Sequence, residues 1–315
     1  LQNILGVVLN LIVLILICNL ADGALQHVKT CLVISTVHSI LYCGSNHLLV
    51  PIHHIIREGY FLTLHGEFLP LLPLPLIPFL FSAWTFLHSL TWTLQPLNFI
   101  VQYYVISKKS GVSGHIFCSL VCLSFCLSIP YFLTCFNLFP SQILSNHISQ
   151  ALEKSYPFEE QSFVSSSFIY GNLFEERKSW ENGVTMVGFC SSFLLSYSIV
   201  LFYICRLIGI TRANLLKDRK KSLRAHARVV RWLIAQSLIP FTPLFIMTSI
   251  TMISITLNLH LPSFSILISI LSSSSPIVQG LVNGVQITRW NCSNLDLSHH
   301  HNGSRRNTIT QSSMM

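Results

Sequence analysis

The sequence predicts an all-α membrane protein, a bundle of seven transmembrane helices with its N-terminus outside and its C-terminus inside. Apolar residues make up 51% of the chain and charged residues only 10%. A helix needs roughly 20 apolar residues to cross a bilayer, and no soluble core of this size requires uncharged runs of such length. Stretches without Lys, Arg, Asp or Glu cover residues 1–21, 30–56, 68–107, 110–152, 182–205 and 232–288.

The distribution of charge between alternate loops predicts the orientation. The loops at 21–30, 107–114, 206–231 and 289–315 hold 15 of the 19 basic residues and 3 of the 11 acidic residues. The two groups of loops carry +12 and −4, which together give the net charge of +8. Basic loops remain in the cytoplasm of most membrane proteins, so these four loops are expected inside, against anionic lipid rather than nucleic acid.

The first two spans are expected at about 4–20 and 31–52, on either side of a short basic inner turn. The third is expected at about 76–106, because the prolines between residues 70 and 78 disfavour a helix before it. Residues 53–67 are acidic and Lys108 and Lys109 are basic, so the chain between them crosses once.

The remaining spans are expected at about 115–138, 184–209, 229–257 and 263–288, which completes a transmembrane domain over residues 1–288. The last uncharged stretch is about 85 Å long as a helix, at about 1.5 Å per residue, enough for two crossings. Asn258, His260 and Pro262 mark the turn between them. The polar tail at 289–315 is predicted to be disordered and cytoplasmic.

The third span carries an aromatic face. Trp84, His88 and Trp92 follow one another at intervals of four residues, which places them on one side of a helix. A titratable side chain among aromatic rings inside a membrane is a candidate ligand-binding wall. Ordinary packing between helices is the alternative, and it is the commoner reason for such a face.

Four histidines gather near the outer end of the second span, at His47, His53, His54 and His65. Imidazole nitrogens bind transition metals, but neighbouring histidines in a loop are weak grounds for a metal site. The ten cysteines lie in or beside spans or in the tail, without metal-ligand spacing on a loop. We therefore predict neither a metal nor another cofactor.

The inner loop at 210–231 alternates leucines with basic residues, which predicts extensions of the fifth and sixth helices with a basic face. The face includes Lys220, Lys221, Arg224 and Arg228. It could meet a cytoplasmic partner or simply anchor the loop to lipid headgroups, and the residues alone leave both readings open.

The sixth span contains two prolines. Pro240 removes the hydrogen bond to the carbonyl of Gln236, and Pro243 extends the distortion, so a kink is predicted. This kink could act as a hinge for the inner half of the helix. Prolines are also common in membrane helices that do not switch, so a static bend is the alternative.

No catalytic arrangement accompanies these features. The chain has no nucleophile–histidine–acid set, zinc-protease motif or phosphate-binding loop, and the predicted spans hold no acidic residue. The sequence therefore predicts that the protein is not an enzyme. The missing intramembrane acids and internal repeats also argue against a proton-coupled transporter.

Several segments in order resemble the nematode seven-transmembrane chemoreceptors of the Str superfamily, and the resemblance covers most of the chain. The similar segments are VVLNLIVLILI around Asn10, HVKTCLVISTVHSILY, QPLNFIVQYYVISK, SLRAHARVVRWLIAQSLIPFTP and SSSSPIVQGLVNGVQITRW. The resemblance implies a G-protein-coupled type of fold and a chemosensory receptor in the plasma membrane, with sensory cilia as one candidate location. It also implies a small ligand, volatile compounds included, and a heterotrimeric G protein as partner.

The resemblance places Gln102 and Tyr103 in the pattern that closes the third helix toward the G protein. The family has arginine where this chain has Gln102, and Asp-Pro where it has Gln279 and Gly280. These departures keep a degenerate, non-functional receptor copy open as an alternative. A ligand-gated cation channel of the insect chemoreceptor type, which also has seven spans, is another and requires the opposite orientation.

Overall fold

The structure is a computed structural model, and all statements below concern the residues that it describes. They are residues 2–19, 26–56, 59–73, 75–108, 112–137, 168–173, 179–215, 234, 238, 241–243, 245–246, 249–250, 253, 267–271, 273–285 and 287–288.

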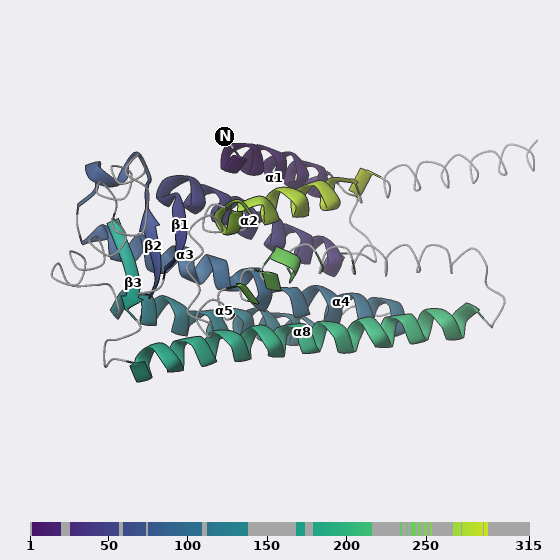
Figure 1. Ribbon diagram of the computed structural model, residues 1–315. Coiled ribbons are helices and arrows are strands. Elements are labelled where there is room, and N and C mark those ends of the chain that lie inside the picture. Colours follow the sequence, from purple (N-terminus) through teal and green to yellow (C-terminus); the bar gives the residue numbers. More distant parts are fainter. Residues whose placement is uncertain are drawn as a thin grey trace, which may run out of the picture.

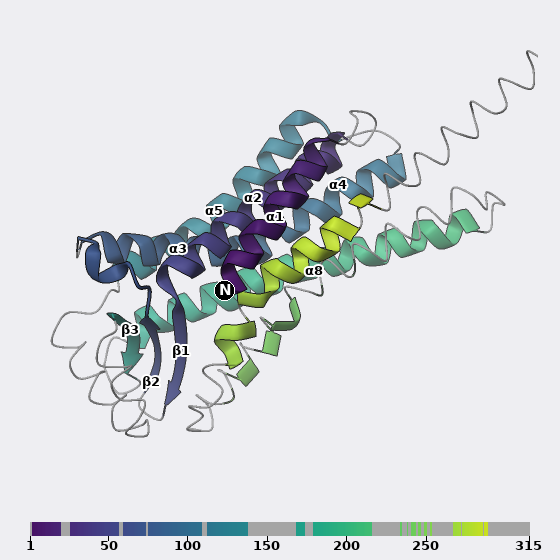
Figure 2. The same cartoon turned by 90° about the horizontal axis from the view of Figure 1, so that it is seen from above.

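Apolar helices lie side by side in a bundle, and a small β-sheet covers one end of it (Figures 1 and 2). The helices are α1 (Gln2–Cys18), α2 (Gln26–Leu49), α3 (Leu76–Thr93), α4 (Gln95–Lys108), α5 (Gly114–Asn137) and α8 (Ser179–Leu215). Among the described residues, three segments are long and apolar enough to cross a membrane, Val28–Leu49, Gly114–Leu133 and Ser191–Ile210. The chain is thus predominantly helical.

The third predicted span is divided into two helices. α3 ends at Thr93, Leu94 caps it, and α4 begins at Gln95. Pro96 has no amide hydrogen to bond the carbonyl of Trp92, and its ring crowds the preceding turn. The single helix predicted over 76–106 therefore has an interruption that the proline in its sequence already indicated.

The prediction of an all-α fold omitted the sheet. β1 (Pro51–Ile56) and β2 (Gly59–Leu64) form a hairpin, and β3 (Phe168–Leu173) joins β2 on its other edge, so the order is β1-β2-β3 with both pairs antiparallel. The strands are rich in β-branched and aromatic residues, which favour extended chain. β2 and β3 are about a hundred residues apart in sequence, so no local pattern reveals their pairing.

Two helix ends also differ from the predicted spans. α2 stops at Leu49 rather than near residue 52, because Val50 turns into a positive φ of 42° and Pro51 starts β1. α8 has 37 residues, about 55 Å at about 1.5 Å per residue. That length exceeds the roughly 30 Å of the hydrocarbon core, so α8 extends beyond the bilayer.

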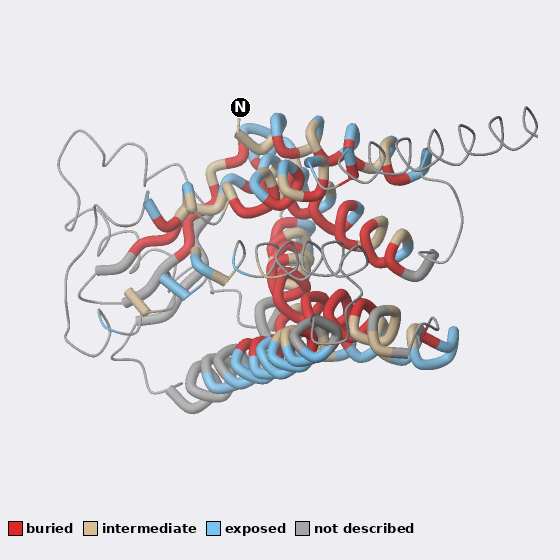
Figure 3. The backbone as a smooth tube through the Cα atoms, turned by 90° about the vertical axis from the view of Figure 1, so that its right-hand side faces the viewer, coloured by how far each residue is buried: buried red, intermediate tan, exposed pale blue. Residues whose placement is uncertain are grey.

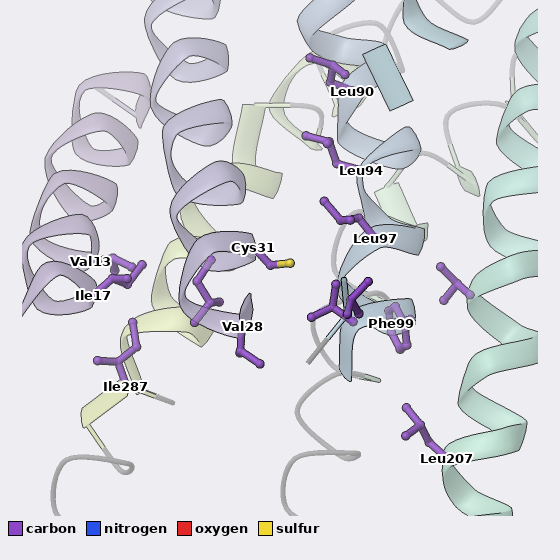
Figure 4. Close-up of a cluster of buried hydrophobic side chains, with 14 residues drawn as sticks. Val13, Ile17, Val28, Cys31, Leu90, Leu94, Leu97, Phe99, Leu207 and Ile287 are labelled. Atoms are coloured by element: carbon purple, nitrogen blue, oxygen red, sulfur yellow. The ribbon is translucent and has the colours of Figure 1, made fainter. Parts of the chain in front are cut away.

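The interior holds separate apolar clusters at the two ends of the bundle, and Figure 3 shows the buried faces of the helices turned toward one another. At the sheet end, Leu62 and Leu64 of β2 pack with Tyr42, Phe81 and Trp84. At the opposite end, a larger cluster joins six helical segments through residues that include Ile17, Val28, Leu90, Phe99, Leu207 and Ile287 (Figure 4). The sheet is therefore fixed to the helices by its own apolar side chains.

Candidate functional site

A buried column of rings runs along α3 from the sheet end toward the middle of the bundle. Trp84, His88 and Trp92 are 2%, 8% and 0% exposed. The rings of Trp84 and His88 are stacked at 5.4 Å, and those of His88 and Trp92 meet edge to face at 5.3 Å. The spacing of four residues thus produces the common face that the sequence predicts.

Helix α2 provides polar partners for this column. The hydroxyl of Tyr42 is hydrogen-bonded to Nδ1 of His88 at 2.7 Å, and Nε1 of Trp84 donates to Oδ1 of Asn46 at 2.7 Å. Tyr42 and Asn46 are one turn apart, so a single face of α2 fixes both rings. A buried polar group without such a partner is costly, and these bonds hold the rings of Trp84 and His88 in one orientation.

At its Trp92 end, the column of rings contacts two further helices, α5 and α8. Trp92 contacts Tyr131 of α5 and Phe193 of α8 edge to face, at 6.0 and 6.2 Å. Nε1 of Trp92 donates to the hydroxyl of Ser192 at 3.3 Å, and that hydroxyl is also hydrogen-bonded to Tyr131. Trp92 thereby joins three helices at the centre of the bundle.

Tyr197 extends this aromatic cluster and brings a hydroxyl group to it. Its ring lies 4.8 Å from that of Phe193 and 4.7 Å from that of Phe241, which belongs to the predicted sixth span. Tyr197 is only 6% exposed, and its hydroxyl has no hydrogen-bond partner in the described part of the chain. Among the described residues, the cluster therefore combines aromatic and aliphatic side chains with one hydroxyl that makes no hydrogen bond.

The spacing of residues predicts the α3 face but not its partners on other helices. Tyr42 and Asn46, and likewise Phe193 and Tyr197, are spaced four residues apart on their helices. That spacing places each pair on one face of its helix, so the sequence contained a signal for both pairs. Which faces meet is decided by the packing of the helices, which the sequence does not give.

The four histidines near the end of α2 do not form one group in the structure. Nε2 of His54 and Nε2 of His65 each lie 2.7 Å from Oγ1 of Thr63, so one hydroxyl joins two imidazoles across the β1–β2 hairpin. His47 is exposed on α2, away from this bridge. Within the described residues, no three His, Cys, Asp or Glu side chains are placed to hold a metal ion.

Acidification is expected to loosen the sheet. Burial lowers the pKa of His54 to about 4, with the charge of His65 adding to the effect, and burial likewise lowers the pKa of His65 to about 4. An unfolded imidazole titrates near pH 6.5, so the stabilisation by neutral His54 is complete above that value and declines toward pH 4. At pH 5 the loss is about 2 kcal/mol.

Hydrogen exchange of the β2 backbone amides, corrected for the intrinsic rate, measures this loss. Protection should fall between pH 7 and pH 5 in the wild type, and the fall should be smaller in His54→Gln, which keeps a polar side chain but does not titrate. An equal fall in both proteins would contradict the assignment to His54.

Gln102 and Tyr103, near the end of α4, were predicted to face a G protein, and this remains a prediction. Gln102 is 5% exposed, because the face of α4 that it shares with Asn98 packs toward α2, where Asn98 donates to Ser35 at 3.4 Å. Tyr103 is partly exposed and its ring meets that of Tyr203 on α8 at 5.2 Å. The contact joins the ends of the third and fifth predicted spans.

Other predicted site residues lie outside the described residues. They are Lys220, Lys221, Arg224 and Arg228 of the basic loop, and Gln236 and Pro240 of the kink. Pro243 is described and lies in a short helical segment at 241–243. The hinge and the basic face therefore remain predictions.

Comparison with known proteins gives one finding about the whole chain. A family model described as serpentine type 7TM GPCR chemoreceptor Str matches residues 1–290. A comparison with curated proteins gave no match. The matched range contains every helix described above together with the sheet.

Proposed function

Because the chain belongs to the Str family of serpentine seven-transmembrane chemoreceptors, an integral membrane receptor family of the G-protein-coupled type, we propose that it binds a small neutral molecule and signals through a heterotrimeric G protein. The observation that carries the choice of site is the aromatic cluster around Trp92 with the Tyr197 hydroxyl, which has no hydrogen-bond partner among the described residues. It touches three helices and Phe241, so a molecule bound there can bias their arrangement.

The predicted spans hold no acidic residue, and their two basic residues, Arg206 and Arg231, lie near span ends, which favours a neutral ligand. A charged group moved from water into a membrane interior is costly unless an opposite charge pairs with it. The described residues around the cluster are aromatic, aliphatic or hydroxyl-bearing. A small molecule with an apolar or aromatic body and one hydrogen-bonding group fits this environment, and Tyr197 is its proposed partner.

We propose seven spans with the sheet outside and the opposite end of the bundle in the cytoplasm. Three observations support this orientation. Lys29 lies near the start of α2, Lys108 ends α4, and Arg206 is next to Leu207 in the cluster farthest from the sheet. Glu67 lies beside the sheet. This distribution agrees with the positive-inside rule, and a channel of the insect chemoreceptor type would need the reverse.

Signalling would then pass from the cluster to the cytoplasmic end along α4 and α8. Phe193 and Tyr197 are on the same helix as Tyr203, whose ring meets Tyr103 of α4. Movement of α8 at the cluster therefore changes the Tyr103–Tyr203 contact. The basic loop at 210–231 would meet the G protein, and the kink at Pro240 would allow the sixth helix to move.

A cell-based reporter of G-protein signalling tests this proposal. Wild type and Gln102→Arg, which introduces the residue that the resemblance leads us to expect, are screened against neutral small molecules, with carboxylates and amines of similar size as comparison. A tag within residues 139–183, stained in unpermeabilised cells, verifies delivery and orientation. If both proteins reach the surface in this orientation and neither responds, the receptor function loses its support.

For any active compound, Tyr197→Phe should raise the half-maximal concentration about tenfold, since loss of one hydrogen bond costs about 1.4 kcal/mol. The folded protein should not lose stability, because the removed hydroxyl has no partner in the described structure. Tyr104→Phe, at the opposite end of the bundle, serves as the control and should leave the half-maximal concentration unchanged. An unchanged response in Tyr197→Phe would exclude the proposed contact.

A further inference from the structure

Large apolar side chains lie exposed between β2 and α3, at the sheet end of the bundle. No side chain in residues 68–81 carries a polar group. The most exposed of these residues are Phe68, Leu71, Leu76 and Phe79, at 54%, 80%, 37% and 47%. Apolar patches of this kind are uncommon on proteins surrounded by water, and they mark surfaces that meet another apolar partner.

The first part of this strip is held to the sheet by one leucine. Leu69 is 1% exposed and belongs to the apolar cluster that contains Leu62 of β2 and Trp84 of α3. It begins the short 3-10 helix η1 (Leu69–Leu71), which has a proline in its first turn. Proline restricts the backbone, so Leu71 is presented outward from a segment that is itself attached to the sheet.

The segment begins at the level where α2 ends. The amide of Gly66 donates to the carbonyl of Leu49 at 3.1 Å. Leu49 is the last residue of Val28–Leu49, one of the segments long and apolar enough to cross a membrane. The chain that follows Gly66 therefore starts at the edge of the hydrocarbon layer on the sheet side, where Figure 2 also shows α3 beginning.

The strip also continues into the lipid-facing side of the bundle. The ring of Phe79, on the first turn of α3, meets that of Phe132 of α5 edge to face at 5.6 Å. Near this contact, the span-length segment Gly114–Leu133 exposes apolar side chains at intervals of four residues, and they are Phe125, Ile129 and Leu133. Residues four apart share one face of a helix, so the strip is continuous with a face of α5 that meets acyl chains.

The backbone of the segment suits an apolar environment. Pro70, Pro73 and Pro75 carry no amide hydrogen. The other described amides from 69 to 76 donate to main-chain carbonyls at 2.9–3.1 Å, and they belong to Leu69, Leu71, Leu72 and Leu76. Leu74 lies outside the described residues. An unbonded amide is costly beside acyl chains, and the described part of this segment avoids that cost.

We propose that the segment at 68–75 inserts the side chains of Phe68 and Leu71 into the lipid leaflet on the sheet side and so ties the sheet to the membrane surface. The side chains would lie at the boundary between acyl chains and headgroups, where interfacial anchors are buried by about 5–10 Å. Glu67, which is exposed and directly precedes the strip, would remain among the headgroups.

A second copy of the chain is the other occupant that an exposed apolar strip can attract. Protein interfaces combine an apolar centre with a polar rim and carry about one hydrogen bond per 100–200 Å². The side chains at 68–81 offer no donor or acceptor, and the described amides from 69 to 76 are already bonded. Acyl chains require no hydrogen bonds, so lipid fits the strip better.

The experiment uses the full chain in lipid nanodiscs with one spin label at a time, attached through p-acetylphenylalanine so that the native cysteines stay unlabelled. The label replaces Leu71, Leu133 on the lipid-facing side of α5, or Ser113, which is exposed in the turn before α5. Oxygen concentrates among acyl chains and a nickel chelate in water. We expect the ratio of oxygen to nickel accessibility at 71 to exceed that at 113 several-fold and to approach that at 133. A label at Phe68 repeats the measurement should the protein labelled at 71 not fold.

Hydrogen exchange of the β2 amides tests whether the anchor holds the sheet. Replacing both Phe68 and Leu71 with serine removes exposed apolar side chains, and we expect the β2 amides to exchange several-fold faster in nanodiscs because the hairpin opens more often. Leu133→Ser removes a lipid-facing side chain far from the hairpin in sequence and should leave this exchange unchanged. Equal exchange in the double variant and the wild type would show that the segment does not tie the sheet to the membrane.

The accessibility measurement can also overturn the proposal in two ways. If nickel reaches 71 as readily as 113, the segment lies in water. If both oxygen and nickel are excluded from 71, protein rather than lipid covers the segment. Dipolar coupling between labels on two chains would then identify a second copy as the cover.

Discussion

Replacing Trp92 with alanine is expected to destabilise the folded chain by about 3–5 kcal/mol, the range for removal of a large buried aromatic side chain. Trp92 is fully buried and joins α3 to α5 and α8 through Tyr131, Phe193 and Ser192. Its removal leaves a cavity where three helices meet and also removes the donor to Ser192. Thermal unfolding in detergent and the amount of protein at the cell surface would both report the loss.

Phe79 is the matched control for this change. It lies on the same helix, is 47% exposed, and its ring meets that of Phe132 edge to face at 5.6 Å. Phe79→Ala should cost less than about 1 kcal/mol, as is usual for exposed positions. Equal losses from the two substitutions would show that Trp92 does not hold the helices together.

Gly66→Ala is expected to destabilise the chain by about 3 kcal/mol, at the upper end for overpacking. Gly66 follows β2 and is buried against the end of α2, where its amide donates to the carbonyl of Leu49 at 3.1 Å. A Cβ atom at Gly66 would overlap the carbonyl oxygen of Leu48. The neighbour is backbone rather than a flexible side chain, so the hairpin or the end of α2 must move.

Gly44→Ala on α2 gives the opposite expectation. A Cβ atom there meets nothing within 4 Å, and alanine is favoured over glycine inside a helix by up to about 1 kcal/mol. In Gly66→Ala, the β2 amides should therefore exchange faster and the unfolding temperature should fall. In Gly44→Ala, the exchange rate should not increase and the unfolding temperature should stay the same or rise. A stable Gly66→Ala protein with unchanged exchange would rule out this close approach.

The part of the candidate site on α3 was predictable because it depends on spacing alone. Residues four apart in a helix share a face, so Trp84, His88 and Trp92 had to align. Tyr42 and Tyr131 could not be assigned to this face, since nothing local tells α2 or α5 which way to turn. The burial of Gln102 likewise could not be predicted, because it depends on how α4 packs against α2.

The sequence by itself determined that the chain belongs in a membrane and to a chemoreceptor family, because apolar length, charge position and motif order are properties of consecutive residues. It also contained the signal for the break at Leu94, in Pro96. Only the tertiary structure decided the pairing of β3 with β2, the bridge from His54 to His65 through Thr63, and the hydrogen bond from Asn10 to the carbonyl of Pro276. These contacts join segments far apart in the chain, and their energies are set by which faces come together rather than by what each segment prefers alone.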